Sequence, residues 1–240
     1  MPETKFPKLT RSPLKEALLD IRLREELPAS VLARFKAPNG FPVAKEMRQS
    51  EFQFKVDDGK PLAQVLGEGA MGWRYEREDG SEVVLLRRNG VTYSILKNYP
   101  GWDVLRDKTR DVWREFLAVS GHVTAGRLAV RYINAIHIPL GADYDDYLTT
   151  GPRIPKSIPP LVTAFMQRVL VPFEEQAATA IITQTLETPS TSAVLDIDVF
   201  TEGSLEGTTE DIWTRLGNLR GIADRVFFSS LTEKVLESYK

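Results

Sequence analysis

The most informative stretch of this chain is RLAVRYINAIHI, residues 127–138. Its apolar side chains recur at every second position, which places them on one side of an extended backbone; they are Leu128, Val130, Tyr132, Ile136 and Ile138. Arg127, Arg131 and His137 fall on the opposite side. This alternation is typical of an antiparallel strand with one face on a core and one face open to solvent or to a partner.

A three-stranded meander is predicted upstream of this strand. The runs 71–77, 82–88 and 91–97 are rich in β-formers, and they are separated by Glu78-Asp79-Gly80-Ser81 and by Asn89-Gly90. Asn-Gly between two such runs favours the tight turn whose twist suits a β-hairpin. The sequence therefore predicts antiparallel pairing of these three runs.

Two long helices are also predicted. Residues 101–119 carry apolar side chains at three- and four-residue spacing, the mark of a helix with one buried face, and these are Leu105, Val112, Trp113, Phe116 and Leu117. A second helix is predicted from Thr208 to the end, opened by Thr208-Thr209-Glu210-Asp211 and broken near Phe228.

The remaining elements are shorter. Alternating patterns predict strands at 17–24, 52–56, 179–186 and 193–200, and a short helix is expected over 28–35. The proline-rich segment 139–160 predicts little regular structure beyond a helical turn at 143–148.

These elements indicate the α+β class, with antiparallel sheet and two long helices packed on one face, because the helices are too few to cross over between every pair of strands. We expect Trp113, Phe116, Leu216 and Val226 in the core. The chain is interpreted as a single domain, 1–240, with a loose N-terminal tail over 1–12. The order strand, helix, strands, long helix is followed by roughly the same order again, so a division into two topologically similar halves, 13–120 and 121–240, stays open.

Composition excludes several classes of protein. The 240 residues carry a net charge of −2, which gives no bulk attraction to nucleic acid or anionic lipid. The chain has no cysteine, hence no disulfide, thiol nucleophile or thiolate metal site. No apolar run is long enough for a membrane span, and the first residues lack the apolar run of a signal peptide, so a cytoplasmic location is expected.

Motifs for nucleotide binding and hydrolysis lack their usual context. The glycines of Gly67–Gly72 are followed by a predicted strand at 73–77, whereas a dinucleotide site needs a helix there. His122 and His137 are the only histidines, and no hydrolase motif accompanies them. We therefore expect no cofactor, and a non-enzymatic role is favoured over an enzymatic one.

The candidate binding residues lie on two strands. Asp196 and Asp198 point to one face of their strand, where they could ligate a hard cation or pair with Arg127 and Arg131. If the arginines are not so paired, they could hold an anion. The candidate set is Arg127, Arg131, Tyr132, Asn134, Asp196 and Asp198, with structural pairing of arginine and aspartate favoured and no metal site assigned.

Aromatic and arginine side chains on the predicted sheet suggest a further alternative. Together they could stack and hold single-stranded nucleic acid, although most such aromatics are core residues. The aromatics are Trp73, Tyr75, Tyr93, Tyr99, Trp102 and Tyr132, and the arginines are Arg74, Arg77, Arg87, Arg88, Arg127 and Arg131.

Six segments in order along the chain carry a resemblance to a family; they are PLKEA at 13–17, GWRY at 72–75, NYPGW at 98–102, RLAVRYIN at 127–134, LDID at 195–198 and FFSSLT at 227–232. The chain resembles a large, sporadically distributed and functionally uncharacterised bacterial family of similar length, which carries a systematic model number. That resemblance implies no catalytic residues. The family's patchy occurrence implies an accessory gene of a mobile or defence-associated system.

The favoured function is a non-enzymatic interaction protein, an accessory or antitoxin- or immunity-like subunit that binds another protein. A sensor or enzyme that binds a small molecule or nucleotide through Arg127 and Arg131 is the first alternative. Single-stranded nucleic-acid binding on the sheet is the second. No membrane partner is expected, nucleic acid is disfavoured, and homo-oligomers stay open.

Overall fold

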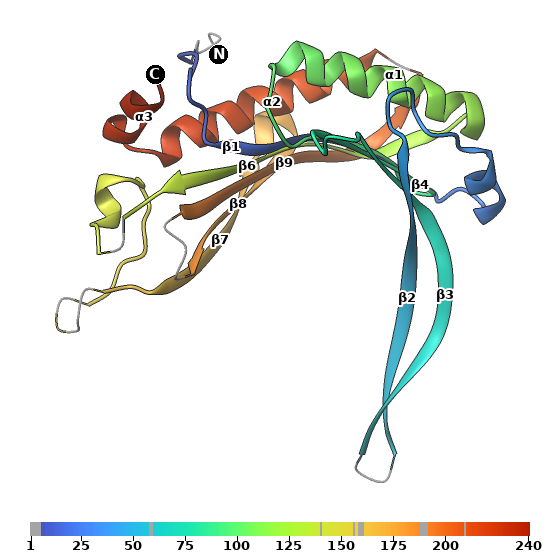
Figure 1. Cartoon of the computed structure of the whole chain (residues 1–240), viewed down its shortest axis with the longest axis horizontal. Coiled ribbons are helices and arrows are strands. Elements are labelled where there is room, and N and C mark those ends of the chain that lie inside the picture. The colour runs from blue at the N-terminus through green and yellow to red at the C-terminus, as the bar shows by residue number, and fades with distance from the viewer. Residues whose placement is uncertain are drawn as a thin grey trace. The chain divides into compact units, whose positions relative to one another are not determined.

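The computed structural model describes residues 6–57, 60–139, 141–155, 157, 161–187, 192–208 and 210–240 (Figure 1). Within them, nine strands form one antiparallel sheet in the order β2-β3-β4-β5-β1-β6-β9-β8-β7. The strands are β1 Leu14–Leu23, β2 Val43–Asp57, β3 Lys60–Glu76, β4 Glu82–Arg87, β5 Gly90–Ile95, β6 Thr124–His137, β7 Ala164–Phe173, β8 Ala178–Glu187 and β9 Ser192–Glu206.

The helices are α1 Trp102–Ser120, α2 Asp211–Ser230 and α3 Glu233–Tyr239, with short 3₁₀ helices η1 Ala29–Arg34, η2 Tyr144–Asp146 and η3 Glu174–Gln176. The predicted α+β class with an antiparallel sheet is confirmed. The short helix expected over 28–35 is present as the six-residue 3₁₀ helix η1, with Pro28 at its N-cap.

The chain divides into two compact units. One, here the β6–β9 unit, consists of Met1–Leu19, Arg127–Gly203 and Glu210–Lys240; the other, here the β2–β5 unit, consists of Asp20–Gly126 and Ser204–Thr209. The boundaries fall inside β1, β6 and β9, whereas the predicted halves divide the chain at residue 120. The halves stay a prediction.

The β2–β5 unit contains the predicted meander. β3 pairs with β4 and β4 pairs with β5, both antiparallel. One detail differs from the prediction: Gly90 already pairs with Arg87, so Arg88 and Asn89 form the turn. Gly90 has φ +134°, and a Cβ at this position would lie 2.0 Å from the Ile21 carbonyl oxygen, so only glycine allows β1 to approach so closely.

Helix α1 covers this unit's core and contacts β5. Its buried residues, Leu105, Thr109, Val112, Trp113 and Phe116, include four of the five predicted stripe residues; Leu117 is only partly buried. Trp113 stacks on Phe116 with ring centroids 5.2 Å apart, and its Nε1 donates a hydrogen bond to Gly207 O at 2.7 Å. The core prediction for these two residues is confirmed.

The β2–β3 hairpin is the long two-stranded arm of the unit (Figure 1). Its register runs from Val43↔Glu76 to Asp57↔Lys60, with shifts after Met47 and Glu51. The predicted strand at 52–56 is thus part of β2, and the glycine motif 67–72 lies inside β3 rather than before a helix. Of the predicted turn after Val56, residues 58 and 59 lie outside the described part of the chain.

In the β6–β9 unit, β7 pairs with β8 and β8 with β9, both antiparallel, and α2 contacts β8. Leu216 and Val226 of α2 are buried, as predicted. The C-terminal helix breaks at Leu231, slightly later than expected, and Thr232 begins α3 by accepting a hydrogen bond from Val235 N. Thr209, part of the predicted capping motif, lies outside the described residues.

Two features of this unit were not predicted. Strand β7 was missed because none of its side chains is buried, so no alternation of buried and exposed apolar residues marks it, and because it contains Pro172. The tail 6–12, expected to be loose, is held by Thr10 N and Arg11 N, which donate to Tyr239 O at 2.9 and 3.0 Å.

Candidate binding face of the sheet

Two arginine–aspartate pairs link β6 to β9. Arg131 Nε donates to Asp196 Oδ1 at 2.7 Å, and its Nη2 donates to Asp196 Oδ2 at 2.6 Å. Arg127 Nη2 contacts both oxygens of Asp198, at 3.0 and 3.3 Å. The predicted pairing of arginine with aspartate is confirmed, and this outcome favours a structural role for the four side chains over an open anion site.

The alternation of β6 and β9 explains why these four side chains meet. On β6, Leu128, Val130 and Ile136 are buried on the opposite face, as predicted, which leaves Arg127 and Arg131 on the open one. On β9 the buried residues are likewise the odd-numbered ones, among them Leu195, Ile197 and Val199. Period-two alternation on both strands therefore brings the charges together.

The same face continues across β8 to β7. Asp196 pairs with Thr183 and Asp198 with Ile181; Thr183 in turn pairs with Arg168, and Ile181 with Leu170. Directly paired residues of antiparallel strands project from the same face of a sheet. We define the β7–β9 face by Met166, Arg168, Leu170, Ile181, Thr183, Asp196 and Asp198.

The electrostatics of the two aspartates follow from their surroundings. Burial raises the pKa of Asp198 above its ordinary value, although Arg127 and Arg131 act in the opposite direction. The hydrogen bonds that Arg131 donates to Asp196 raise the pKa of Arg131 above its ordinary value, so Arg131 stays charged. The Arg127 guanidinium also lies 4.5 Å from the centre of the Phe200 ring, a cation–π contact that fixes its position.

The apolar part of the β7–β9 face is strongly exposed. The side chains of Met166 and Leu170 are 77% and 62% exposed, the largest values for large apolar residues in the described part of the chain. Val169 and Val171, which alternate with them, are also exposed on the other side of β7. An apolar strand exposed on both faces is a feature of surfaces that meet other molecules.

Tyr132 and Asn134, the other two predicted binding residues, lie on the buried face of β6. Both are in the core, and Asn134 Nδ2 donates to Leu195 O at 3.2 Å. This hydrogen bond satisfies a buried amide and ties β6 to β9. The structure thus brings Arg127, Arg131, Asp196 and Asp198 together and separates Tyr132 and Asn134 from them.

Sequence reasoning did not identify Met166, Arg168 and Leu170. The available signal was the composition of residues 164–173, which include one charged side chain and six large apolar ones. Without the alternation of a half-buried strand, that composition does not distinguish a strand from a loop.

The β2–β5 unit has a buried charge cluster of its own. Arg87 Nη2 donates to Asp20 Oδ1 at 2.7 Å, Arg22 Nε donates to Asp20 Oδ2 at 2.8 Å, and the Thr92 hydroxyl donates to Asp20 as well. Burial raises the pKa of Asp20, but Arg87, Arg22 and Thr92 outweigh it, so the pKa lies below its ordinary value. The cluster joins β1, β4 and β5, and both oxygens of Asp20 are held by arginines.

A second cluster lies at α1. Lys108 Nζ donates to Glu82 Oε1 at 2.6 Å, and the Tyr93 hydroxyl donates to Glu82. Burial, together with this carboxylate, raises the pKa of Tyr93, so the phenol stays protonated. These contacts fix α1 on the meander and place no reactive group in an open site.

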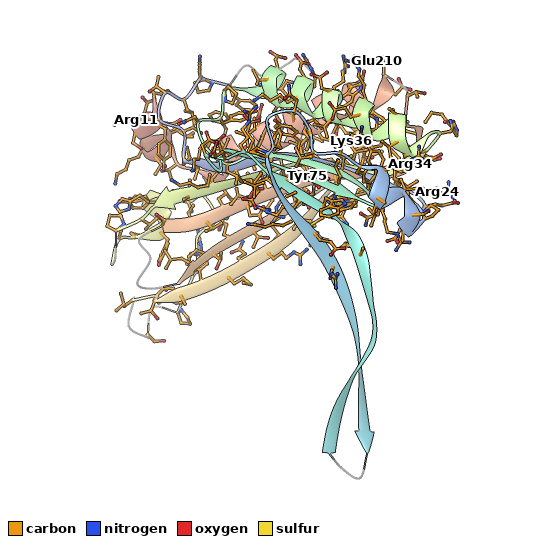
Figure 2. All side chains as sticks on the ribbon, turned by 45° about the vertical axis from the view of Figure 1, so that its right-hand side comes forward. Arg11, Arg24, Arg34, Lys36, Tyr75 and Glu210 are labelled. Atoms are coloured by element: carbon orange, nitrogen blue, oxygen red, sulfur yellow. The ribbon has the colours of Figure 1, made fainter. Side chains whose placement is uncertain are left out.

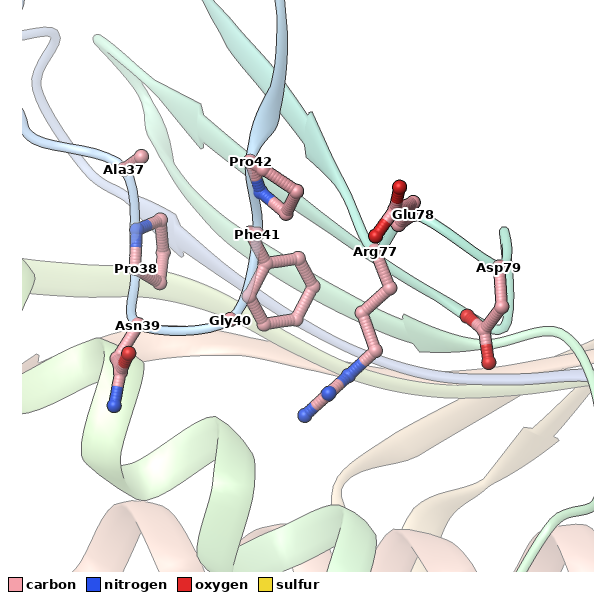
Figure 3. A pocket seen from close by; sticks show the side chains of 9 residues that line it. All are labelled: Ala37, Pro38, Asn39, Gly40, Phe41, Pro42, Arg77, Glu78 and Asp79. Atoms are coloured by element: carbon pink, nitrogen blue, oxygen red, sulfur yellow. The ribbon is translucent and has the colours of Figure 1, made fainter.

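A shallow hollow of about 700 Å³ lies beside the turn at Glu78-Asp79 (Figure 3). Phe41 and Arg77 lie side by side in its lining, with the guanidinium 5.2 Å from the ring centre. Arg77 also lies 3.3 Å from Glu82 Oε2, so its charge is already balanced. The hollow offers neither a nucleophile beside a base nor a set of metal ligands.

Metal and hydrolytic sites find no support in the described part of the chain, where no group of three or more His, Asp or Glu side chains could hold a metal ion. His122 lies 2.9 Å from Glu206 on an exposed surface, and His137 is exposed at the end of β6.

The aromatics considered for nucleic-acid stacking are mostly internal. Tyr75, Tyr93 and Tyr132 are buried, and Trp73 and Trp102 are partly buried. Figure 2 shows Tyr75 among packed side chains, whereas Arg24, Arg34 and Lys36 project near η1. A stacking platform needs exposed rings beside basic side chains, and none of the six aromatics is fully exposed.

No family model matches the chain, and no curated protein matches it. The resemblance to a sporadically distributed bacterial family accordingly stays a prediction. Among the described residues, no helix is both long enough and apolar enough to cross a bilayer.

Proposed function

We propose that this chain is a non-enzymatic binding protein that engages another protein through the β7–β9 face. The observation that carries the proposal is the exposure of Met166 and Leu170 beside charges that are already paired. Exposed apolar anchors next to fixed polar groups are the composition of protein interfaces. An accessory or immunity-like role in a mobile or defence-associated system belongs to this proposal through the family resemblance alone.

The arrangement of charges supports binding of a protein over binding of a small anion. An anion clamp needs guanidinium groups that can donate to the ligand. Here Arg131 donates two hydrogen bonds to Asp196, and Arg127 is held by Asp198 and Phe200. A ligand phosphate would have to displace both carboxylates.

Site-specific photo-crosslinking in the cells that naturally produce the chain tests this proposal. A photoreactive amino acid replaces Leu170 in one variant and Val104 in the control; Val104 is 38% exposed on α1, which belongs to the β2–β5 unit and not to the β7–β9 face. We expect a discrete protein adduct from position 170 and none from position 104. Absence of an adduct at 170, or the same adducts from both positions, contradicts the proposal.

A thermal-shift screen with nucleotides distinguishes this proposal from the first alternative, a small-molecule or nucleotide site at Arg127 and Arg131. A ligand at a hundred times its dissociation constant adds about 2.7 kcal/mol to the free energy of unfolding. We expect no stabilisation. Stabilisation that is lost in Arg131→Ala would favour the anion-binding alternative instead.

A further inference from the structure

We propose that the free edge of β7 binds an extended segment of the partner protein as an additional antiparallel strand, and that this segment has the pattern apolar–x–acidic–x–apolar. The inference rests on the proposed function and names the mode of binding and the chemistry of the partner. Addition of a strand to an exposed sheet edge is an established mode of peptide recognition, in which main-chain hydrogen bonds give affinity and alternate side chains give specificity.

Strand β7 ends the sheet and carries little of the charge that commonly protects an edge strand. It pairs with β8 over all ten residues from Ala164 to Phe173, and its other edge has no neighbouring strand among the described residues. Soluble proteins commonly block such edges with several charges. Arg168 is the only charged side chain in β7.

The opposite edge of the sheet provides a contrast. Strand β2 carries Lys45, Glu46 and Arg48 within its first six residues, and these form ion pairs, Lys45 with Glu76 and Arg48 with Glu46. Charges so dense disfavour pairing with another strand. The chain therefore protects one edge and leaves the other accessible.

Pro172 fixes which main-chain groups of β7 face outward. Proline has no N–H and occurs in edge strands with its nitrogen on the open side. Because main-chain groups alternate along a strand, Met166, Arg168 and Leu170 then also direct N–H and C=O to the open edge. These three residues offer a ladder of hydrogen bonds that stops at Pro172.

The side chains of the same three residues define the sequence that would match. Met166, Arg168 and Leu170 project from the β7–β9 face, opposite Thr185, Thr183 and Ile181 of β8. Arg168 makes no ion pair with any described residue. An added strand satisfies all three positions with an apolar, an acidic and an apolar residue, since opposite charges and apolar pairs across strands are stabilising.

A second copy of the chain is a poorer occupant. Strand β7 contains no acidic residue. Two copies of β7 related by a twofold axis at Gln167 or Val169 would place Arg168 opposite Met166 or Leu170, and an axis at Arg168 would place two arginines together. No such register gives Arg168 a carboxylate, so charge favours a heterologous segment.

Peptide binding to the purified full chain tests the inference by fluorescence anisotropy. The probe is a labelled peptide with the core Val-Thr-Glu-Thr-Val, and the matched control has Lys in place of Glu. We expect the Glu peptide to bind about fivefold more tightly than the Lys peptide, the ratio expected of a favourable cross-strand charge pair. Arg168→Glu should reverse this preference.

Leu170→Pro tests the main-chain ladder. It removes an outward N–H at a position where, as at Pro172, proline is compatible with an edge strand, and circular dichroism checks that the variant is folded. We expect it to abolish peptide binding. Equal affinities for both peptides, no binding to the wild type, or a dimer of the chain that Leu170→Pro disrupts would overturn the inference. A persisting crosslink at position 170 would leave the proposed function intact in each of these cases.

Discussion

Arg131 of β6 donates two parallel hydrogen bonds to Asp196 of β9, with Nε–Oδ1 and Nη2–Oδ2 distances of 2.7 and 2.6 Å. This geometry matches the planar guanidinium to the planar carboxylate, which a lysine could not do. The residues are 65 positions apart in sequence, so the pair links two distant segments of the β6–β9 unit. Because both carboxylate oxygens of Asp196 accept hydrogen bonds from Arg131, a metal ion would have to compete with that arginine for them.

A double-mutant cycle measures this pair. Because Arg131 is 41% exposed at its side chain and water screens the interaction, we expect a coupling free energy of about 1 kcal/mol between Arg131→Ala and Asp196→Ala. Urea unfolding of the wild type, both single variants and the double variant gives the value. Strictly additive single effects would contradict a stabilising pair.

Asp20 and Asp198 are predicted to respond oppositely to replacement by asparagine. The folded-state pKa of Asp20 is below its ordinary value, so its ionised form stabilises the fold at neutral pH, and this stabilisation is lost as the pH falls below 3.8 through the folded-state pKa. Asp20→Asn should cost about 3 kcal/mol at pH 7, as expected for breaking a buried pair. The deficit should shrink with acidification, measured by urea unfolding at several pH values.

Asp198 is the matched comparison. Burial holds its folded-state pKa above the ordinary value of 3.8, so its protonated form is the one that the fold favours, and that contribution is lost as the pH rises through the folded-state pKa. Asp198→Asn, which mimics the protonated form, should therefore leave the free energy of unfolding at pH 7 unchanged or raise it. A loss as large as that of Asp20→Asn would contradict the burial argument.

Trp113 should be the most sensitive position of α1. It is buried, stacks on Phe116 and bonds to Gly207 O. Trp113→Ala should lower the free energy of unfolding by about 3–5 kcal/mol, whereas Trp113→Phe, which keeps an aromatic ring and loses the hydrogen bond, should cost less. Chemical denaturation checks both, and a cost below 1 kcal/mol for alanine would be inconsistent with burial.

Replacement of Gly90 and of Gly221 by alanine should change the free energy of unfolding in opposite directions. A Cβ at Gly90 would lie 2.0 Å from Ile21 O, and the residue has φ +134°, so Gly90→Ala should destabilise by about 3 kcal/mol. Gly221 lies inside α2 with no atom within 4 Å of a new Cβ, so Gly221→Ala should stabilise by about 0.8 kcal/mol. Thermal unfolding of the two variants distinguishes them directly.

The spacing of apolar residues was sufficient to predict a strand or helix wherever that element buries one face. The alternation of residues 127–138 predicted β6, and the helical stripe around Trp113 predicted α1, because in each case one face packs on a core. The same alternation predicted that Arg127 and Arg131 project from one face of β6. Asp196 and Asp198, which share a face of β9, were the candidate partners. Strand β7 has no buried face, so its sequence shows no regular alternation of apolar and polar residues.

The sequence by itself determined the α+β class, the meander and the two long helices, and it placed Arg127 with Arg131, and Asp196 with Asp198, on one face of each strand. Each of these depends on residues close together in the chain or on alternation alone. Only the tertiary structure decided that β6 lies beside β9, so that the charges pair and Asn134 bonds to Leu195 O, that Gly90 is needed for close approach of β1, and that Met166, Arg168 and Leu170 lie at a free edge. Exposure of an edge depends on which strands pair, and strand order arises from contacts between distant residues that no local pattern encodes.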